Sequence, residues 1–282
     1  MIIWIASYPK SGNTWLRALL ASYFFSEKGE FDFSLLDKIK QFPDSDYFIK
    51  DKDQYSTLES TSKNWIKKQS IINLDRKLKF FKTHNAICSI NGNSFTDSKN
   101  SLGAVYIVRD PRNVITSLAN HYQIDQNEAL SFMTNEKRYI YQKKGERYLA
   151  FSPLFSWSSH IESWTTTKLF PVLTIRYEDL HLETFETLKK VINFIKTVSK
   201  SNISFKREKA KQSIYSCGFD KLKDLEKRKG FSESVIKKDK SGKVDFFNLG
   251  KDNNYKKILN KKLVDEMNSI YNENLMKFKY EK

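Results

Sequence analysis

The sequence is poor in the residues that build disulfide frameworks, metal clusters and membrane spans. Its 282 residues include two cysteines, Cys88 and Cys217, and four histidines. Without a CxxC pair or a His cluster, neither a disulfide framework nor a zinc site is indicated, and we expect no metal. No apolar run reaches the roughly 18 residues that a membrane span needs. The short apolar start at residues 1–6 lacks the basic leader of a signal peptide, so we expect a cytoplasmic protein without a membrane span.

Positive charge is in excess, with 49 Lys and Arg against 33 Asp and Glu, a formal net charge of +16. Such a charge attracts polyanions of any kind, whether nucleic acid, an anionic membrane surface or a phosphorylated small molecule. Many of the lysines lie in the C-terminal third, and Lys-rich faces are commonly solvated surface. Because 39% of the residues are hydrophobic, the chain can bury a core, and we expect one domain over residues 1–282.

Buried strands alternate with amphipathic helices along the chain. A strand at 2–6 precedes a helix at 14–25, a strand at 104–108 precedes a helix at 112–122, and a strand at 171–176 precedes a helix at 184–195. Residues 80–84 read as a further buried strand. This alternation predicts an α/β fold with a central parallel sheet and helices on both faces.

Three segments fall outside this alternation. The polar, aromatic-dotted stretches at about 32–73 and 123–152 are weakly periodic, and we interpret them as helical insertions and loops that form an acceptor pocket. The segment at about 230–260 is rich in Lys, Gly and Asp beyond Lys237. We expect it to close over a bound nucleotide.

The octapeptide at 8–15, YPKSGNTW, lies where the first buried strand meets the first helix. Backbone N–H groups and the helix dipole make such a junction a site for phosphate. It is not a Walker A loop, because GxxxxGK[ST] places the lysine after the second glycine whereas Lys10 precedes Gly12. The sequence therefore predicts an anion cradle of a different type.

This octapeptide resembles the 5′-phosphosulfate loop YPKSGTTW of the cytosolic-type sulfotransferases that use 3′-phosphoadenosine 5′-phosphosulfate (PAPS), with Asn13 as the one departure. The resemblance, to a bacterial-type or viral member, implies a P-loop-like fold, PAPS as donor and adenosine 3′,5′-bisphosphate (PAP) as product. It implies that Lys10 contacts the 5′-phosphate, that residues 11–14 wrap it and that Trp15 stacks on adenine. The implied donor-binding residues of this loop are Lys10, Ser11, Gly12, Asn13, Thr14 and Trp15.

Lys82-Thr83-His84 at the end of the 80–84 strand matches the family's Lys-Thr-His. The resemblance implies that His84 is the general base and that Lys82, with Lys10, stabilises charge as the group moves. A neutral imidazole can take a proton from an acceptor hydroxyl. A single histidine is more commonly structural than catalytic. We expect His84 to be the base because the phosphosulfate loop is present in the same sequence. The family's usual Leu-Pro is replaced here by Asn85-Ala86.

Arg109 ends the 104–108 strand and Ser117 follows eight residues later, the spacing of the family's 3′-phosphate segment. An arginine at a strand end and a hydroxyl two turns along the next helix can converge on one phosphate. The alternative is that Arg109 pairs with Asp110 and that Ser117 merely packs.

The remaining family matches are weaker. Residues 156–164 resemble its SWxxHxxSW helix, which we interpret as core. Residues 177–179, which we expect to form a turn, match the family's Tyr-Glu-Asp. The resemblance implies that Tyr177 hydrogen-bonds adenine, and the alternative is a buried packing role. Phe219 and Gly250 stand at the C-terminal adenine and 3′-phosphate positions. The family's Arg-Lys-Gly is replaced by Asn248-Leu249-Gly250, so two cations are missing. The candidates to replace them are Lys251, Lys256 and Lys257.

We therefore predict a sulfotransferase that moves a sulfuryl group from PAPS to a hydroxyl or amine of a small acceptor. The partners expected are that acceptor and no nucleic acid, and the oligomeric state, monomer or homodimer, stays open. The alternatives are a P-loop nucleotide kinase, a basic nucleic-acid-binding protein and a sulfotransferase-like protein that binds nucleotide without turnover.

Overall fold

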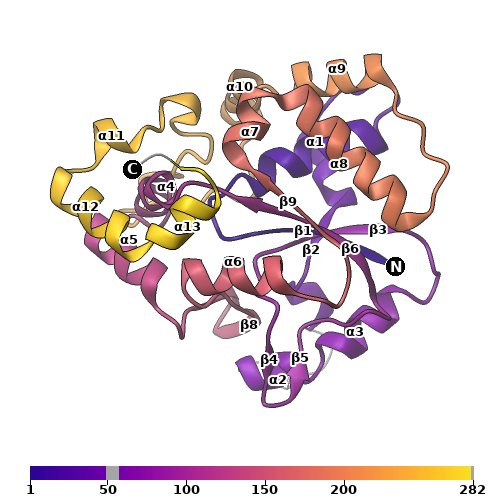
Figure 1. The fold of residues 1–282 in the computed structure, drawn as a ribbon, viewed down its shortest axis with the longest axis horizontal. Coiled ribbons are helices and arrows are strands. Elements are labelled where there is room, and N and C mark those ends of the chain that lie inside the picture. Colours follow the sequence, from indigo (N-terminus) through magenta and orange to yellow (C-terminus); the bar gives the residue numbers. More distant parts are fainter. Residues whose placement is uncertain (49–56, 281–282) are drawn as a thin grey trace.

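The computed structural model describes residues 1–48 and 57–280. Its centre is a parallel five-stranded sheet in the order β2-β3-β1-β6-β9 (Figure 1). The strands are β1 (Ile2–Ser7), β2 (Lys40–Gln41), β3 (Lys79–Thr83), β6 (Ser101–Val108) and β9 (Val172–Arg176). This confirms the predicted parallel sheet and adds β2, a two-residue strand paired with β3 at the sheet edge.

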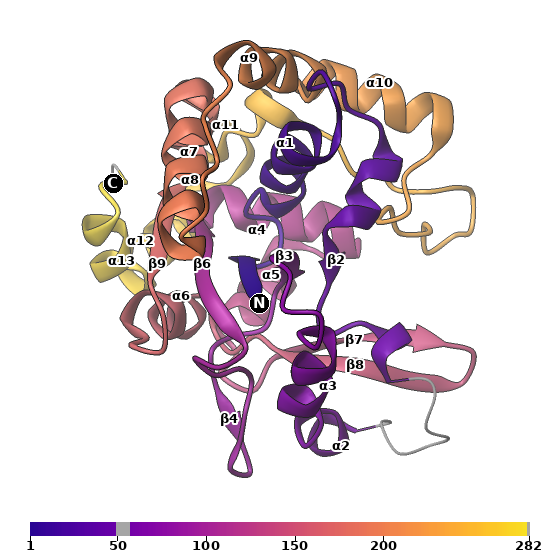
Figure 2. The same ribbon diagram turned by 90° about the vertical axis from the view of Figure 1, so that its right-hand side faces the viewer.

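Helices cover both faces of the sheet because alternate residues of each strand point to opposite sides. Ile3 and Ile5 of β1 pack with α1 (Asn13–Phe25), α8 (Thr184–Ser199) and α9 (Arg207–Ser216). Trp4 and Ala6 face the second cluster, which includes α3 (Trp65–Ile72), α4 (Pro111–Tyr122), α5 (Gln126–Thr134), α6 (Trp157–Thr166) and α12 (Lys261–Ile270). Figure 2, turned by a quarter, shows α1 and α8 together on one side of the sheet.

Short elements connect these layers. They are η1 (Phe33–Lys38), η2 (Ser45–Tyr47), α2 (Leu58–Ser62), the β4–β5 hairpin (Ser89–Ile90 and Asn93–Ser94), α7 (Tyr177–Leu182), α10 (Phe219–Lys229), η3 (Gly250–Asp252), α11 (Tyr255–Ile258) and α13 (Asn272–Lys277). The expected turn at 177–179 is thus a short helix. Part of the 32–73 insertion, residues 49–56, lies outside the described residues.

The insertion at 123–152 corrects one prediction. Helix α5 was expected, but residues 139–153 form an antiparallel hairpin of β7 (Tyr139–Lys144) and β8 (Arg147–Pro153) in place of helices and loops. Gly145 at φ 58° occupies the first position of the two-residue turn, where hairpins favour glycine. The alternation of aromatic and polar residues around Lys-Lys-Gly-Glu was the signal for this hairpin.

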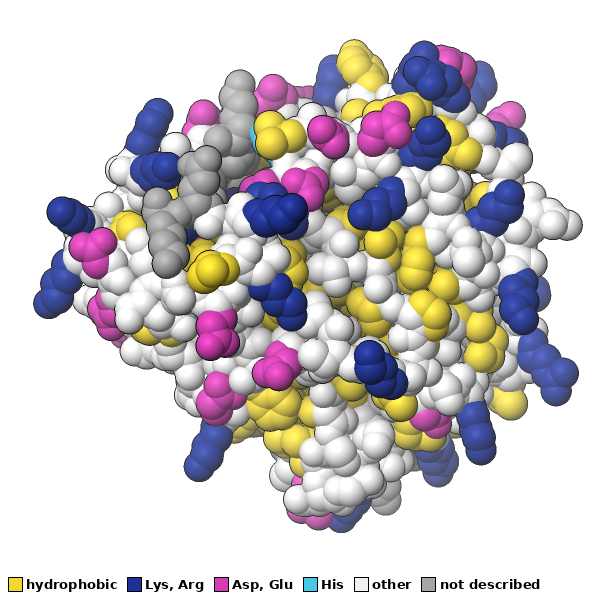
Figure 3. Space-filling model, viewed as in Figure 1, with side chains coloured by type: hydrophobic (Ala, Val, Ile, Leu, Met, Phe, Trp, Pro, Cys, Tyr) yellow, Lys and Arg dark blue, Asp and Glu magenta, His cyan; other side chains and the backbone are white. Residues whose placement is uncertain are grey.

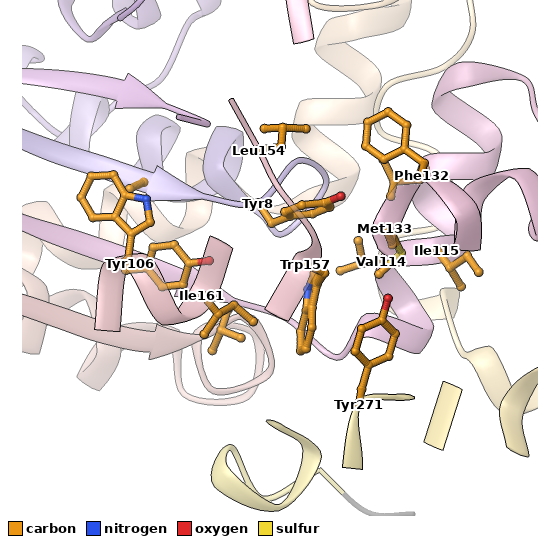
Figure 4. Close-up of a cluster of buried hydrophobic side chains, with 14 of the residues drawn as sticks. Tyr8, Tyr106, Val114, Ile115, Phe132, Met133, Leu154, Trp157, Ile161 and Tyr271 are labelled. Carbon is orange, nitrogen blue, oxygen red and sulfur yellow. The ribbon is translucent and has the colours of Figure 1, made fainter. Parts of the chain in front are cut away.

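Aromatic residues fill the core beside the first loop. Tyr8, the first residue of the 8–15 loop, packs with Leu154 and Trp157, and Tyr271 lies beyond Trp157 (Figure 4). The rings of Trp157 and Tyr271 meet edge to face at 5.0 Å. This packing fixes the start of the 8–15 loop against α6 and the C-terminal helices. Among the described residues, no helix is both long and apolar enough to cross a membrane.

Candidate active site

A cavity of about 500 Å³ opens at the carboxyl ends of the strands, the edge where parallel α/β sheets form their sites. It is lined by the β1–α1 loop, the ends of β3 and β6, the α4 helix, the start of α7 and the segment after α10. The predicted site residues that line it are Lys10, Gly12, Asn13, Thr14, Trp15, Lys82, His84, Arg109, Ser117, Tyr177, Phe219 and Gly250. Ser11 is buried beside them, and its hydroxyl has no hydrogen-bond partner among the described residues.

The first loop is shaped by two residues in the left-handed region. Lys10 has φ 66° and Gly12 has φ 98°, and a Cβ on Gly12 would lie 2.4 Å from the Tyr177 ring. Only glycine therefore fits beneath this tyrosine. The first hydrogen bonds of α1 run from the N–H groups of Trp15 and Leu16 to the Gly12 carbonyl, so earlier N–H groups of this turn have no acceptor within the helix.

The side chains of this loop divide between the cavity and the scaffold. The Asn13 amide donates to the Ile5 carbonyl at 2.9 Å and so ties α1 to β1. Trp15 donates to the Cys217 carbonyl at 2.9 Å and meets the Tyr177 ring edge to face. Both residues also line the cavity, so they hold the scaffold and border the site at once.

Lys10 lies with its Nζ 4.0 Å from the centre of the Phe246 ring. The pKa of Lys10 is lowered to about 8, mainly by burial; Glu233 opposes this shift, and Arg109 and Lys82 add to it. An ammonium so poorly solvated and surrounded by cations gains from any anion that enters the cavity.

His84 follows the end of β3 and lies half-buried at the cavity wall. Its Nδ1 is 2.7 Å from the Ser7 carbonyl oxygen. Because a carbonyl can only accept, Nδ1 carries the proton and Nε2 is the unprotonated nitrogen. Burial, and then the nearby Lys82 charge, lower the pKa of His84 to about 3. The free protein therefore holds a neutral imidazole with one nitrogen ready to accept a proton.

Helix α6 supports His84 from behind. His160, wholly buried, donates from Nε2 to the His84 carbonyl oxygen at 3.0 Å, and its Nδ1 accepts from the Tyr106 hydroxyl at 2.9 Å. Trp157 and Trp164 are buried on the same face of α6. The interpretation of this helix as core is confirmed, and His160 in addition fixes the backbone of the predicted base.

Arg109 and Ser117 come together as predicted. Nη1 of Arg109 donates to the Lys10 carbonyl at 2.9 Å and lies 3.4 Å from the Ser117 hydroxyl, and the guanidinium stacks 4.2 Å from the Tyr177 ring centre. The alternative pairing with Asp110 is not what the structure shows. That carboxylate is instead held by Arg112, with Nη2 at 2.7 Å from Oδ2.

The C-terminal segment around Gly250 lies near Ser117. It lacks the two cations that the family's Arg-Lys-Gly has there. Gly250 has φ 54° and lies so close to Phe219 that a Cβ would be 2.7 Å from its ring. Asn253 donates to the Ser117 hydroxyl at 3.0 Å. Lys256 and Lys257 are exposed, and the Lys251 side chain lies outside the described atoms. Lys223, which sequence reasoning did not consider, donates to the Asn248 carbonyl at 3.1 Å.

Sequence reasoning missed three residues with acidic or imidazole side chains that line the cavity: His121, His181 of α7 and Glu233. His121 lies one helical turn beyond Ser117 on α4, and its pKa is lowered to about 4, first by burial and then by Lys10. Glu233 accepts from Lys82 Nζ at 2.9 Å and from the Thr14 hydroxyl at 3.0 Å. The i, i+4 spacing from Ser117 could have revealed His121. No local pattern marked Glu233.

The segment after α10 carries Glu233 into the site. Residues 236 and 243 pair as a short antiparallel bridge, and Phe246 and Phe247 return to line the cavity. Glu226 of α10 holds this return by accepting from the N–H groups of Phe246 and Phe247 at 2.8 and 3.0 Å. The stretch expected to cover a nucleotide thus lies against the cavity.

Basic side chains on the outer surface are scattered. On the face in Figure 3, Lys and Arg side chains are spread among acidic and apolar ones, with no single patch. Those that line the cavity within the described side chains are Lys10, Lys82 and Arg109. Among the described residues no three His, Cys, Asp or Glu side chains cluster as metal ligands would.

Comparisons with known proteins agree with this geometry. A family model described as "Sulfotransferase domain" matches residues 2–279. Two similar solved structures are retinol dehydratase with androsterone and inactive cofactor PAP, at 15% identity and TM-score 0.60, and retinol dehydratase with retinol and PAP, at 16% and 0.59. Each alignment covers 97% of this chain, and 80% and 81% of the other chain respectively. No curated protein matches the sequence.

The two solved structures show a shared fold, and the family model covers nearly the whole chain. The family expected from YPKSGNTW and the segments after it is confirmed, and the kinase and nucleic-acid alternatives lose their support. The chain belongs to the sulfotransferase domain family and is a PAPS-dependent sulfotransferase.

Proposed function

We propose that the protein transfers the sulfuryl group of PAPS to a hydroxyl or amine of a small acceptor, with His84 as general base. The observation that carries this proposal is the unprotonated Nε2 of His84 in a cavity that also receives Lys10 and Lys82. A neutral base and two ammonium groups at one strand edge suit an attack in which a proton leaves and negative charge moves between oxygens.

The cavity has separate groups for the two charged ends of PAPS, the 5′-phosphosulfate and the 3′-phosphate. Arg109 has a buried Nε without a hydrogen-bond partner among the described residues, and the Ser11 hydroxyl is in the same state. Such buried polar groups are costly unless a ligand completes them. We assign the 5′-phosphosulfate to Lys10 and the N–H groups at 11–14, and the 3′-phosphate to Arg109 and Ser117. Trp15, Tyr177 and Phe219 would surround the adenine ring.

The proton and charge movements follow from these positions. His84 Nε2 would accept the acceptor's proton, and the imidazolium formed would keep its Nδ1–H bond to Ser7. Lys10 and Lys82 would offset the charge that grows on the leaving phosphate. His160 would keep the His84 backbone still during this exchange.

Residues from the two insertions, 32–73 and 123–152, line the acceptor side of the cavity. Gln41 of β2 and Ile140 of β7 line it, together with Tyr122, His121 and Phe246. This wall mixes aromatic surface with a few polar groups, the usual make-up of a small-molecule pocket. Retinol and androsterone, the ligands of the similar structures, are hydroxylated small molecules with large apolar bodies. We propose an acceptor of comparable chemistry, a hydroxylated molecule with an apolar body.

Calorimetric titration with PAP, adenosine 5′-monophosphate and magnesium-ATP is the first test. We expect PAP to bind more tightly than the monophosphate, because only PAP reaches Arg109 and Ser117. Transfer of radiolabelled sulfate from PAPS to a panel of phenols, sterols and retinoids then tests the reaction. Tighter binding of magnesium-ATP would favour a kinase, and PAP binding without transfer to any acceptor would favour a non-catalytic protein.

A further inference from the structure

Glu233 has no part in the proposed mechanism, yet it stands between two buried cations, Arg17 and Lys82. Its Oε2 accepts from Lys82 Nζ at 2.9 Å and from the Thr14 hydroxyl at 3.0 Å, and its Oε1 contacts Arg17 Nη1. The side chains of Arg17 and Lys82 are 9% and 7% exposed, and that of Glu233 is 22% exposed. Three separate parts of the chain, α1, β3 and the segment after α10, therefore meet at one carboxylate.

Arg17 holds the carboxylate in place. This arginine is buried, and besides Glu233 its guanidinium donates to the Leu36 carbonyl at 3.3 Å. Loss of Glu233 from this position would leave a buried guanidinium without its carboxylate, which is strongly unfavourable. Glu233 is thus anchored through Oε1, and Oε2 is the atom that faces the cavity.

We propose that Glu233 is a positioning residue, which holds the Lys82 ammonium toward the transferred group while Arg17 anchors its other oxygen. The proposal rests on the proposed function, in which Lys82 offsets moving charge. Lys82 must carry its proton to act in this way, and a lysine on a flexible stem needs a fixed partner to keep one direction.

The charges around Lys82 give Glu233 a second effect. Burial lowers the pKa of Lys82, Glu233 raises it most among the neighbours, and Arg17 lowers it. Burial would raise the pKa of the Glu233 carboxyl itself, but Lys82 and Arg17 hold it well below its usual range. The ionisable groups that act on Lys82 or respond to it are Glu233, Arg17, Asp44, Lys10, His84 and His121. Removal of the Glu233 charge thus favours the neutral amine.

The test compares Glu233→Gln, which loses the charge, with Glu233→Asp, which keeps it. Glu226→Gln is the matched control, because Glu226 also organises the covering segment but accepts from backbone N–H groups and from Ser234. The titration of Lys82 is followed by NMR in full-length protein with labelled lysine, both free and with PAP bound, and its signal is the one absent from Lys82→Arg. Circular dichroism checks that each variant is folded.

We expect the midpoint of the Lys82 titration to fall by about one pH unit or more in Glu233→Gln, a tenfold larger neutral fraction. It should stay near the wild-type value in Glu233→Asp and Glu226→Gln. The alkaline limb of kcat should move to lower pH in Glu233→Gln by the same amount. If that variant does not fold, Glu233→Asp should still lower kcat with little change in KM for PAPS, because the shorter side chain cannot reach both cations.

Two results would overturn the proposal. One is an unchanged Lys82 midpoint in folded Glu233→Gln. The other is a tenfold gain in PAP affinity in that variant, which would make Glu233 a stand-in for the donor's anion that binding displaces. Failure of the proposed function would look different, since PAP would then not bind or no acceptor would be sulfated, whereas the Lys82 midpoint of the free protein would still respond to Glu233.

Discussion

The protonation of Lys10 should make donor-site affinity depend on pH in a range where few other groups titrate. In the free protein burial lowers the pKa of Lys10 to about 8. A bound phosphate stabilises the ammonium and raises this pKa, so PAP binding takes up a proton above pH 8. If the pKa in the complex lies well above 10, the affinity for PAP falls about fivefold from pH 8 to 9 and about ninefold from pH 9 to 10.

Calorimetry in two buffers of different ionisation enthalpy measures both the affinity and the proton taken up. Lys10→Arg is the control, because a guanidinium stays charged over this range and should give a flat profile. Lys10→Met should bind weakly at every pH. A flat wild-type profile between pH 7 and 9.5, with no proton uptake, would refute the assignment of Lys10 to the anion.

Three further outcomes are expected. His84→Ala should abolish most turnover and leave PAP affinity within about threefold, whereas near-normal turnover would reject His84 as base. Because its pKa of about 3 keeps the free imidazole neutral, the pH profile of kcat/KM should show no acid limb from His84 above about pH 5. Gly12→Ala should destabilise the loop by about 1–3 kcal/mol and weaken PAP binding, because the new Cβ would overlap the Tyr177 ring; an unchanged Tm would contradict this. Arg112→Met should lower stability by about 3–5 kcal/mol in urea unfolding, because it strands the buried Asp110 carboxylate.

Much of the site was visible in the sequence because the signals are local. Lys10, Gly12 and Thr14 lie in one strand-to-helix segment, and Arg109 and Ser117 are only eight residues apart, at the end of β6 and in the second turn of α4. The alternation of strands and helices then placed these segments at one edge, since parallel strands share the direction of their carboxyl ends. The family pattern supplied the roles that local physics left open.

Other features were missed or could not be decided from the sequence. The hairpin at 139–153 had a local signal, the aromatic and polar alternation around Gly145-Glu146, but the stretch was interpreted as helical insertions and loops because it is polar and weakly periodic. Arg109 had two plausible partners in sequence, Asp110 and Ser117. The structure decides between them because Arg112, three residues on, reaches back to the Asp110 carboxylate and leaves Arg109 to the cavity.

The sequence by itself determined the α/β alternation, the strand-to-helix loop to which we assign the 5′-phosphosulfate and the order of the family motifs, because each depends on residues within a turn or two of one another. Only the tertiary structure brought Glu233 against Lys82, Thr14 and Arg17, across more than 150 residues of chain. A carboxylate largely removed from water is stable only beside cations, and the positions of Arg17 and Lys82 are set by the packing of α1 and β3. The contact between Glu233 and Lys82 is therefore a property of the fold.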